Sequence, residues 1–261
     1  MKLSEIFNIL EEVAPVSLSD EFCSKFKMYD NSGIIIDCGE DIKGVLFTLD
    51  LTNAAVAEAR AKGYNLIVTH HPAIYGGISR FDTQNNPQAK GLADCMKYGI
   101  SVISMHLNFD AAPEGIDYHL MRGLGGSECK IAAQLDNGGY GRVYPVAPDI
   151  LSNYVKKVAK EFNTQRLVVY GDKDKPVKKV ASFCGAGCDD FNMNFAIKNG
   201  ADVFVSADMK HHEILALTQS GLAVIVLTHY ASENYGLQQI YKKIKDRLNV
   251  NSSYLTYENL L

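Results

Sequence analysis

The stretch NAAVAEARAKGYNLIVTHHP, residues 53–72, contains the pattern that predicts the fold. Its first ten residues form an Ala-rich helical pattern, for which Asn53 is the expected N-cap. Gly63 is expected to close that helix, and residues 65–69 are then predicted to form a short buried strand. A helix that leads directly into a buried strand indicates an α/β fold.

The same alternation continues along the whole chain, which indicates α/β architecture throughout. The expected helices are residues 3–13, 53–62, 154–162 and 232–248. The expected strands are residues 44–50, 65–69, 100–105, 179–183, 202–206 and 222–227. We therefore expect an α/β protein with two related α/β subdomains, whose sheets are mixed or mainly parallel.

The boundary between the two subdomains is expected near residue 125, giving subdomains 1–125 and 126–261. The Gly- and Pro-rich stretch 126–149 is predicted to link them. An arrangement in which the last helix of the second subdomain packs back on the first is left open. Residues 59–69 resemble residues 196–206, since each is a helix end, a Gly and a strand. Shared βαβ ancestry and simple likeness between any two such units both explain this.

Composition excludes several classes of protein. The 261 residues are 47% apolar and 21% charged, with a formal net charge of −4. Lys and Arg are scattered, so no basic stripe for nucleic acid is present. No apolar run reaches the ~18–20 residues of a membrane span, and the N-terminus lacks a signal-peptide pattern. We therefore expect a cytoplasmic protein without a membrane or nucleic-acid partner.

The six cysteines lie at long and irregular spacings, apart from Cys184 and Cys188. A disulfide framework is not expected in a chain of this length without an export signal, so reduced and mostly buried thiols are predicted. Cys184 and Cys188 could chelate or crosslink. Their spacing is not that of a CxxC motif and no second pair accompanies them, which leaves their role open.

Histidines follow directly on three of the predicted strands. They occur in Val68-Thr-His-His-Pro72, in Ser104-Met-His106 and in Leu227-Thr-His229. In parallel α/β sheets, ligands bind outside the carboxyl ends of the strands. Three strands therefore bring histidines to this kind of edge, and a metal site is predicted there.

Two of these histidines have a carboxylate four residues later: His106 has Asp110, and His229 has Glu233. A helix starting at Ala231 or Ser232 would place Glu233 in its first turn, where the helix dipole favours a negative charge. His70 and His71 are expected to point in opposite directions along an extended segment. Two neighbours that point apart suit two metal ions better than one.

The number of ligands also indicates two ions. Four imidazoles and two carboxylates exceed the three or four protein ligands of a mononuclear zinc site. Any one of these histidines alone is more simply interpreted as a capping or core residue, but their convergence favours ligation. Nitrogen and oxygen donors without thiolate suit Zn, Mn, Fe, Co or Ni, among which the sequence does not choose.

Six sequence blocks resemble the successive motifs of the Nif-three-like family, whose members are described as dinuclear metal centre hexameric proteins and GTP cyclohydrolase I type-two homologs. The blocks are YDNSG at 29–33, LFTLDLT at 46–52, THHPAIY at 69–75, HLNFDAAPEGIDYHL at 106–120, SADMKHHE at 206–213 and LTHYASENYGL at 227–237. The resemblance spans about residues 1–248. The HHP, HxNxD and HYxSE blocks, in this order, are its most specific part.

The resemblance implies a Nif-three-like fold, two divalent metal ions per chain and a ring-shaped homohexamer. The implied metal ligands are His70, His71, Asp110, His229 and Glu233. His106 matches the histidine of the HxNxD block and is expected to be a ligand or a close neighbour of the metals.

This chain departs from the usual family pattern in three respects. Tyr29 stands where a Trp is usual, and Cys188 and Asp189 stand where Gly and Ser are more usual. The large inserted domain of some longer members is absent. A Gly-rich turn that opens a helix can bind phosphate, but Asp189 and Asp190 would repel it, so that role is given less weight.

We expect metal-dependent hydrolysis of a nucleotide or phosphorylated small molecule, with a metal-bridging hydroxide as nucleophile and Glu233 as the candidate bridging ligand. Nothing in these residues selects guanine. The alternative is a non-enzymatic, metal-binding ring that acts as a scaffold or binds partners. A role in proton transfer for His119, and a place near the site for His211 or His212, are left open.

Overall fold

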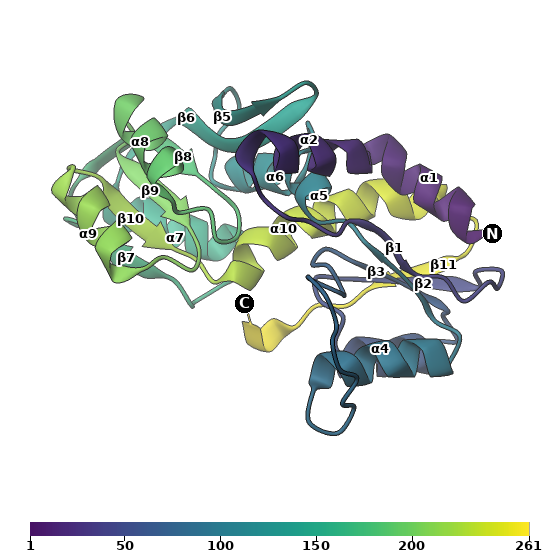
Figure 1. Cartoon of the computed structure of the whole chain (residues 1–261). Helices are drawn as coiled ribbons and strands as arrows, with labels where there is room; N and C mark the ends of the chain where they lie inside the picture. Colours follow the sequence, from purple (N-terminus) through teal and green to yellow (C-terminus); the bar gives the residue numbers. More distant parts are fainter. Residues whose placement is uncertain (261) are drawn as a thin grey trace. The chain divides into compact units, whose positions relative to one another are not determined.

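A computed structural model of the chain describes residues 1–260, which divide into two compact units (Figure 1). The first unit consists of residues 1–112 and 237–256, and the second of residues 113–236 and 257–261. Each unit contains one sheet with helices, which confirms the predicted α/β class. Among the described residues, no helix is long and apolar enough to cross a membrane.

The sheet of the first unit has five strands in the order β1-β4-β3-β2-β11. Only β1 is antiparallel to its neighbour. The strands are β1 (Gly33–Ile36), β2 (Gly44–Thr48), β3 (Leu66–Thr69), β4 (Ser101–Ser104) and β11 (Asn251–Tyr254). The helices assigned wholly to this unit are α1 (Leu3–Val13), α2 (Val16–Phe26), α3 (Asn53–Ala61), α4 (Pro87–Lys97) and α5 (Leu107–Ala111), with the 3-10 turn η1 (Lys245–Arg247).

Helices lie on both faces of this sheet, with α1 on one side and α4 on the other (Figure 1). Alternate strand residues point to opposite faces. Leu46 and Ile67 pack in one cluster with Val56 of α3 and Leu92 of α4. Phe47, next along β2, instead packs against a tyrosine of α10, described below. Both faces are therefore covered, and the central strands read as continuous apolar runs.

The second unit has a six-stranded sheet in the order β5-β6-β8-β9-β10-β7. Strands β8, β9 and β10 are parallel, and the remaining pairings are antiparallel. The strands are β5 (Lys130–Leu135), β6 (Gly138–Ile150), β7 (Val168–Tyr170), β8 (Pro176–Ser182), β9 (Val203–Ser206) and β10 (Ala223–Val226). The helices are α6 (Ile116–Gly123), α7 (Leu151–Glu161), α8 (Asp190–Lys198) and α9 (His211–Gln219), with the 3-10 turn η2 (Glu258–Leu260).

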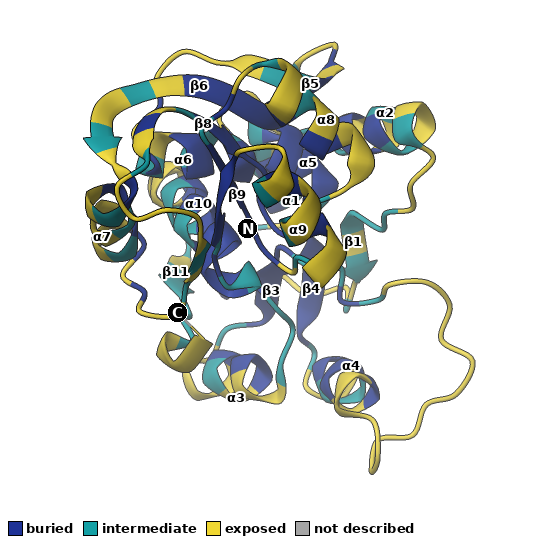
Figure 2. Cartoon of the chain, turned by 90° about the vertical axis from the view of Figure 1, so that its left-hand side faces the viewer, coloured by how far each residue is buried: buried dark blue, intermediate teal, exposed yellow. Residues whose placement is uncertain are grey.

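The core of this unit forms where apolar residues of β8 and β9 meet α8 and α9. The stacked rings of Phe183 and Phe204 lie 4.9 Å apart, between centroids, and pack with Ala196 of α8 and Leu217 of α9. Figure 2 shows β9, with β3 and β4 of the first unit, as buried strands, whereas much of α9 is exposed.

Helix α10 (His229–Ile244) begins in the second unit and contributes its residues from Leu237 onward to the first. In the first unit, the ring of Tyr241 lies 5.0 Å from that of Phe47. Strand β11 follows and pairs in parallel with β2. The last part of the chain thereby completes the first sheet.

Two local predictions were wrong. The N-cap of α3 is Thr52, whose side chain accepts a hydrogen bond from the Ala55 amide at 3.0 Å, so Asn53 is already helical. The stretch 126–149 contains no simple linker: it forms the β5–β6 hairpin, which is part of the second sheet. The sequence Asp136-Asn137-Gly138 is typical of a tight β-hairpin turn and indicates this hairpin, although the whole stretch is rich in Gly and Pro.

The local likeness between residues 59–69 and 196–206 extends to the backbone. Gly63 and Gly200 follow the ends of α3 and α8 with φ of +70° and +67°, and a buried strand comes next in each case. These angles favour glycine, because a side chain there meets the following carbonyl. The predicted role of Gly63 is therefore confirmed.

A buried ion pair joins a helix to two parts of the sheet in the second unit. Asp117 of α6 pairs with Arg142 of β6, and both are almost wholly buried. Asp117 also accepts hydrogen bonds from the Gly141 amide at 2.9 Å and from the Cys184 amide at 3.2 Å. One carboxylate thus connects α6, β6 and the turn that follows β8.

We predict that Asp117→Ala destabilises the second unit by about 3–5 kcal/mol, because Arg142 would remain buried without its counter-charge. Lys157→Ala is the control, since the Lys157 side chain, which pairs with Asp149, is largely exposed. It should leave the unfolding midpoint almost unchanged. Urea unfolding followed by circular dichroism measures both effects. Equal, small effects for the two variants would contradict the role of Asp117.

Candidate metal centre

His70 and His71 lie immediately after β3, and backbone hydrogen bonds to the segment after β2 position both. Their backbone amides donate to the Leu49 carbonyl at 3.1 and 2.9 Å. Strand β3 ends at Thr69, so the two histidines do not continue it. Their ring centroids are 5.0 Å apart, and the expectation that they point in opposite directions was therefore wrong.

His106 joins these two histidines from the end of β4. Its ring centroid is 5.2 Å from that of His70 and 5.8 Å from that of His71. The three side chains offer nitrogen atoms that all lie within 4.8 Å of one another, a spacing at which they could hold a metal ion. We call His70, His71 and His106, with Asp110, the histidine cluster.

Asp110 is placed by α5, the short helix for which His106 is the N-cap. The Asp110 amide donates to the His106 carbonyl at 3.0 Å. Its carboxylate Oδ1 lies 3.5 Å from Nε2 of His70, and both side chains are nearly inaccessible to solvent. The HxxxD spacing therefore puts a carboxylate beside the histidine that follows the neighbouring strand β3.

His229 and Glu233 form a second group, in the second unit. Helix α10 begins at His229, earlier than the predicted start at Ala231 or Ser232. His229 and Glu233 are therefore one helical turn apart on the same helix. His229 Nε2 is 3.1 Å from Glu233 Oε1. We call these two residues the His229–Glu233 pair.

The Gly-rich turn after β8 packs against this pair. Gly185 has φ of +57°, and a Cβ at this position would lie 2.2 Å from Glu233 Oε1. The Gly185 amide donates to the Ser232 hydroxyl at 3.0 Å. At the far end of the turn, the Asp189 side chain caps α8 by accepting from the Asn192 amide at 2.8 Å. In this structure the turn thus supports a carboxylate and a helix start.

All four histidines share one feature: Nδ1 of each ring is hydrogen-bonded to an oxygen. The partners are the Met105 carbonyl for His70 at 2.9 Å, Asp50 for His71 at 2.7 Å, Asp30 for His106 at 2.7 Å, and Asp208 for His229 at 2.5 Å. Such a partner fixes the tautomer and ring orientation, because Nδ1 donates to it and Nε2 is left as the metal-binding atom.

The three aspartates were not identified from the sequence, although each lies in one of the quoted blocks. Asp30 is 76 residues from His106, and Asp50 and Asp208 are each 21 residues from their histidines. The position of Asp50 just after β2, beside the strand β3 that precedes His71, was the available signal. No sequence spacing reveals the Asp30 contact.

Asp30 is the most strongly held of the three. Burial by itself raises the pKa of the Asp30 carboxyl. The hydrogen bond and the charge of His106 lower the pKa, as do hydrogen bonds from Ser19 and Ser32, and together they bring it to about 2. The Ser32 hydroxyl also accepts from the His106 amide at 3.0 Å. His106 is therefore fixed through both its ring and its backbone.

Other residues noted in the sequence are not part of these groups. His211 and His212 are exposed at the start of α9, and His119 lies on α6, where its ring contacts Tyr118. All six cysteines are free thiols. Burial raises the pKa of Cys188 to about 12, so this thiol stays protonated near neutral pH.

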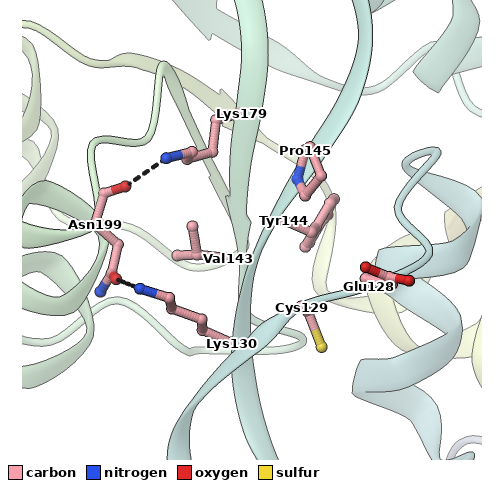
Figure 3. Close-up of a pocket in the computed structure, with 8 residues that line it drawn as sticks. All are labelled: Glu128, Cys129, Lys130, Val143, Tyr144, Pro145, Lys179 and Asn199. Atoms are coloured by element: carbon pink, nitrogen blue, oxygen red, sulfur yellow. Dashed lines mark hydrogen bonds between the residues drawn. The ribbon is translucent and has the colours of Figure 1, made fainter.

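A hollow of about 290 Å³ in the second unit contains none of the predicted ligands (Figure 3). Two of its side chains hold Asn199, at the end of α8: Lys130 donates to the Asn199 side chain at 3.3 Å, and Lys179 donates to its carbonyl at 3.0 Å. The lysines thus stabilise the negative end of a helix dipole.

The whole chain matches one family model, Duf34/NIF3 (NGG1p interacting factor 3), over residues 1–258. The chain belongs to the Duf34/NIF3 family. A Clostridium perfringens protein named GTP cyclohydrolase 1 type 2 homolog is 29% identical, over 98% of this chain and 95% of its own. The yeast Saccharomyces cerevisiae NGG1-interacting factor 3 is 31% identical, over 83% of each chain.

The family is also seen in the fold. A hypothetical protein from Staphylococcus aureus superposes with a TM-score of 0.85 and 24% identity, over 99% of this chain and 97% of that one. A Bacillus cereus protein related to NIF3 superposes with a TM-score of 0.84 and 20% identity, over 97% and 96%. These two likenesses confirm the fold, and the family model confirms the resemblance that the sequence blocks indicated.

We predict that Gly185→Ala lowers metal affinity about ten- to hundredfold, because the added methyl group would displace the Glu233 carboxylate. Gly200→Ala is the matched control: Gly200 has a similar positive φ, but nothing lies within 4 Å of a Cβ there. Titration of the metal-free variants with Zn²⁺ or Mn²⁺ against a competing chelator measures affinity. Equal losses in both variants would show that backbone strain, and not Glu233, is responsible.

Proposed function

We propose that this protein binds two divalent metal ions through His70, His71, Asp110, His229 and Glu233 and uses them to hydrolyse a nucleotide or a phosphorylated small molecule. The observation that carries the proposal is the engagement of all four Nδ1 atoms, which makes Nε2 the nitrogen through which each imidazole would bind a metal. Oriented imidazoles with polar partners are typical of metal ligands.

The donors fit the proposed ions. They are nitrogen and oxygen atoms without thiolate, which suits Zn²⁺, Mn²⁺, Fe²⁺, Co²⁺ or Ni²⁺. Two such ions supply a nucleophile from water near neutral pH and stabilise developing negative charge. We propose Glu233 as the bridging ligand, since the Gly185 turn limits where its carboxylate can move. His106 is proposed as an additional ligand or as a close neighbour.

The partner aspartates add negative charge around the proposed metal ions. Asp30, Asp50 and Asp208 add three formal negative charges to those of Asp110 and Glu233. The positive charge of two divalent ions would therefore be fully neutralised by the surrounding carboxylates. Nearby negative charge raises the pKa of an acidic group, so we expect the catalytic ionisation above pH 7.

The relatives' names support two different functions. The Clostridium perfringens relative is named for GTP cyclohydrolase, an enzyme, whereas the yeast relative is named for its interaction with NGG1. A metal-binding scaffold that binds partners is therefore the second candidate. For either function we propose a homohexamer, on the family resemblance alone. The free thiols support our proposal of a cytoplasmic location.

Metal content tests the binding part of the proposal. The reconstituted protein is expected to hold about two equivalents of metal per chain, since its ligands exceed those of one tetrahedral site. Glu233→Ala should lower occupancy more than His106→Ala, because Glu233 is assigned a shared position. Elemental analysis of gel-filtered protein measures both. Protein that stays free of metal after reconstitution would refute the proposal.

Turnover tests the catalytic part. On any nucleotide or phosphoester that a screen identifies, the rate should rise with pH through one ionisation and vanish with a chelator. Asp110→Ala should reduce the rate to background, whereas His119→Ala should retain most of it. A pH–rate profile of the three proteins measures this. Tight metal binding without any turnover would favour the scaffold function.

A further inference from the structure

Two tyrosine rings of the first unit remain exposed although they contact one another. Tyr29 and Tyr75 are 51% and 59% exposed. Their ring centroids lie 5.3 Å apart with an interplanar angle of 81°. Two large rings that contact one another at the surface offer an exposed aromatic face to which a planar ligand can bind.

The pair is held rigidly by the chain segments that carry it. The Tyr75 hydroxyl donates to the Tyr29 carbonyl at 3.2 Å. Two residues further on, the Asn31 side-chain amide donates to the Ile74 carbonyl at 2.7 Å. These two hydrogen bonds join segment 29–31 to segment 74–75, and the first restrains the Tyr75 ring directly, so this ring has less freedom to lose when a ligand binds.

The segment that carries Tyr29 also holds His106 of the histidine cluster in place. Asp30, directly after Tyr29, accepts from His106 Nδ1, and Ser32 accepts from the His106 amide. Tyr75 follows four residues after His71, in the segment that leaves β3. Four consecutive residues, 29–32, therefore each contact a segment that carries a histidine or the second tyrosine. The short segment that carries Tyr29 thus also holds His106 in place.

We propose that Tyr29 and Tyr75 form a stacking platform, in which one ring offers its face and the other, nearly perpendicular, its edge to the planar aromatic ring of a ligand whose phosphate or polar end binds the metals, so that the substrate class is a nucleotide and not a simple phosphoester. This rests on the proposed metal-binding function. Aromatic rings stack on any nucleobase, because every base has a π face. The platform therefore selects for a base without choosing among bases.

The test compares two probes that differ by the base alone: adenosine monophosphate and ribose 5-phosphate. Isothermal titration of metal-loaded protein with each probe gives the affinities. Tyr75→Leu should weaken binding of the nucleotide about tenfold and leave ribose 5-phosphate binding unchanged. Tyr75→Phe, which retains the ring, should keep most of the nucleotide affinity.

Two further variants sharpen the comparison. Tyr29→Leu should repeat the effect of Tyr75→Leu. Tyr170→Leu, which removes an exposed tyrosine of the second unit, should change neither affinity. The ratio of the two affinities within each variant removes any general loss of folding or metal.

Several outcomes would overturn the inference. Wild-type protein that binds the two probes equally has no platform for a base. Unchanged nucleotide affinity in both leucine variants would likewise exclude the tyrosines. If light scattering showed that these variants change only the association state, the pair would be a contact between copies. Each outcome leaves the metal and turnover tests of the proposed function intact, so the two failures are distinguishable.

Discussion

The hydrogen bond on Nδ1 of each histidine is the constraint on which the candidate site depends. An imidazole on a loop can rotate and exchange tautomers, and either change would remove Nε2 from a metal. Here a backbone carbonyl holds His70, and carboxylates hold His71, His106 and His229. The aspartates also add negative charge, which strengthens the ligands as bases while making the bound ions weaker acids. The same contacts thus favour tight metal binding and oppose easy ionisation of water.

This arrangement depends on where the strands end, because the histidines lie just beyond the last strand residues. Strands β3 and β4 stop at Thr69 and Ser104, so that the histidines beyond them leave the sheet. In the second unit, α10 starts at His229, and the positive φ of Gly185 lets the neighbouring turn approach Glu233. Each ligand therefore stands on the end of a regular element, which is a more rigid support than a long loop.

Much of the fold could be predicted from the sequence, because short apolar runs, three of them followed by histidine, mark the central parallel strands. Which distant segments pair with one another could not be predicted. Strand β11 joins β2 across about two hundred residues, and its Asn-Ser-Ser-Tyr sequence has no apolar signature. The carboxylates at HxxxD and HxxxE offsets were found because those offsets are local. The contact between Asp30 and His106 depends on the antiparallel pairing of β1 with β4, which local pattern does not specify.

Anomalous diffraction from crystals of the metal-loaded protein would locate the ions and identify their ligands. We expect two metal peaks that are coordinated by Nε2 of His70, His71 and His229 and by the carboxylates of Asp110 and Glu233. The Nδ1 atoms of the histidines should keep their present oxygen partners. Peaks located elsewhere, or coordination through Nδ1 with the aspartate hydrogen bonds broken, would contradict the proposed metal centre.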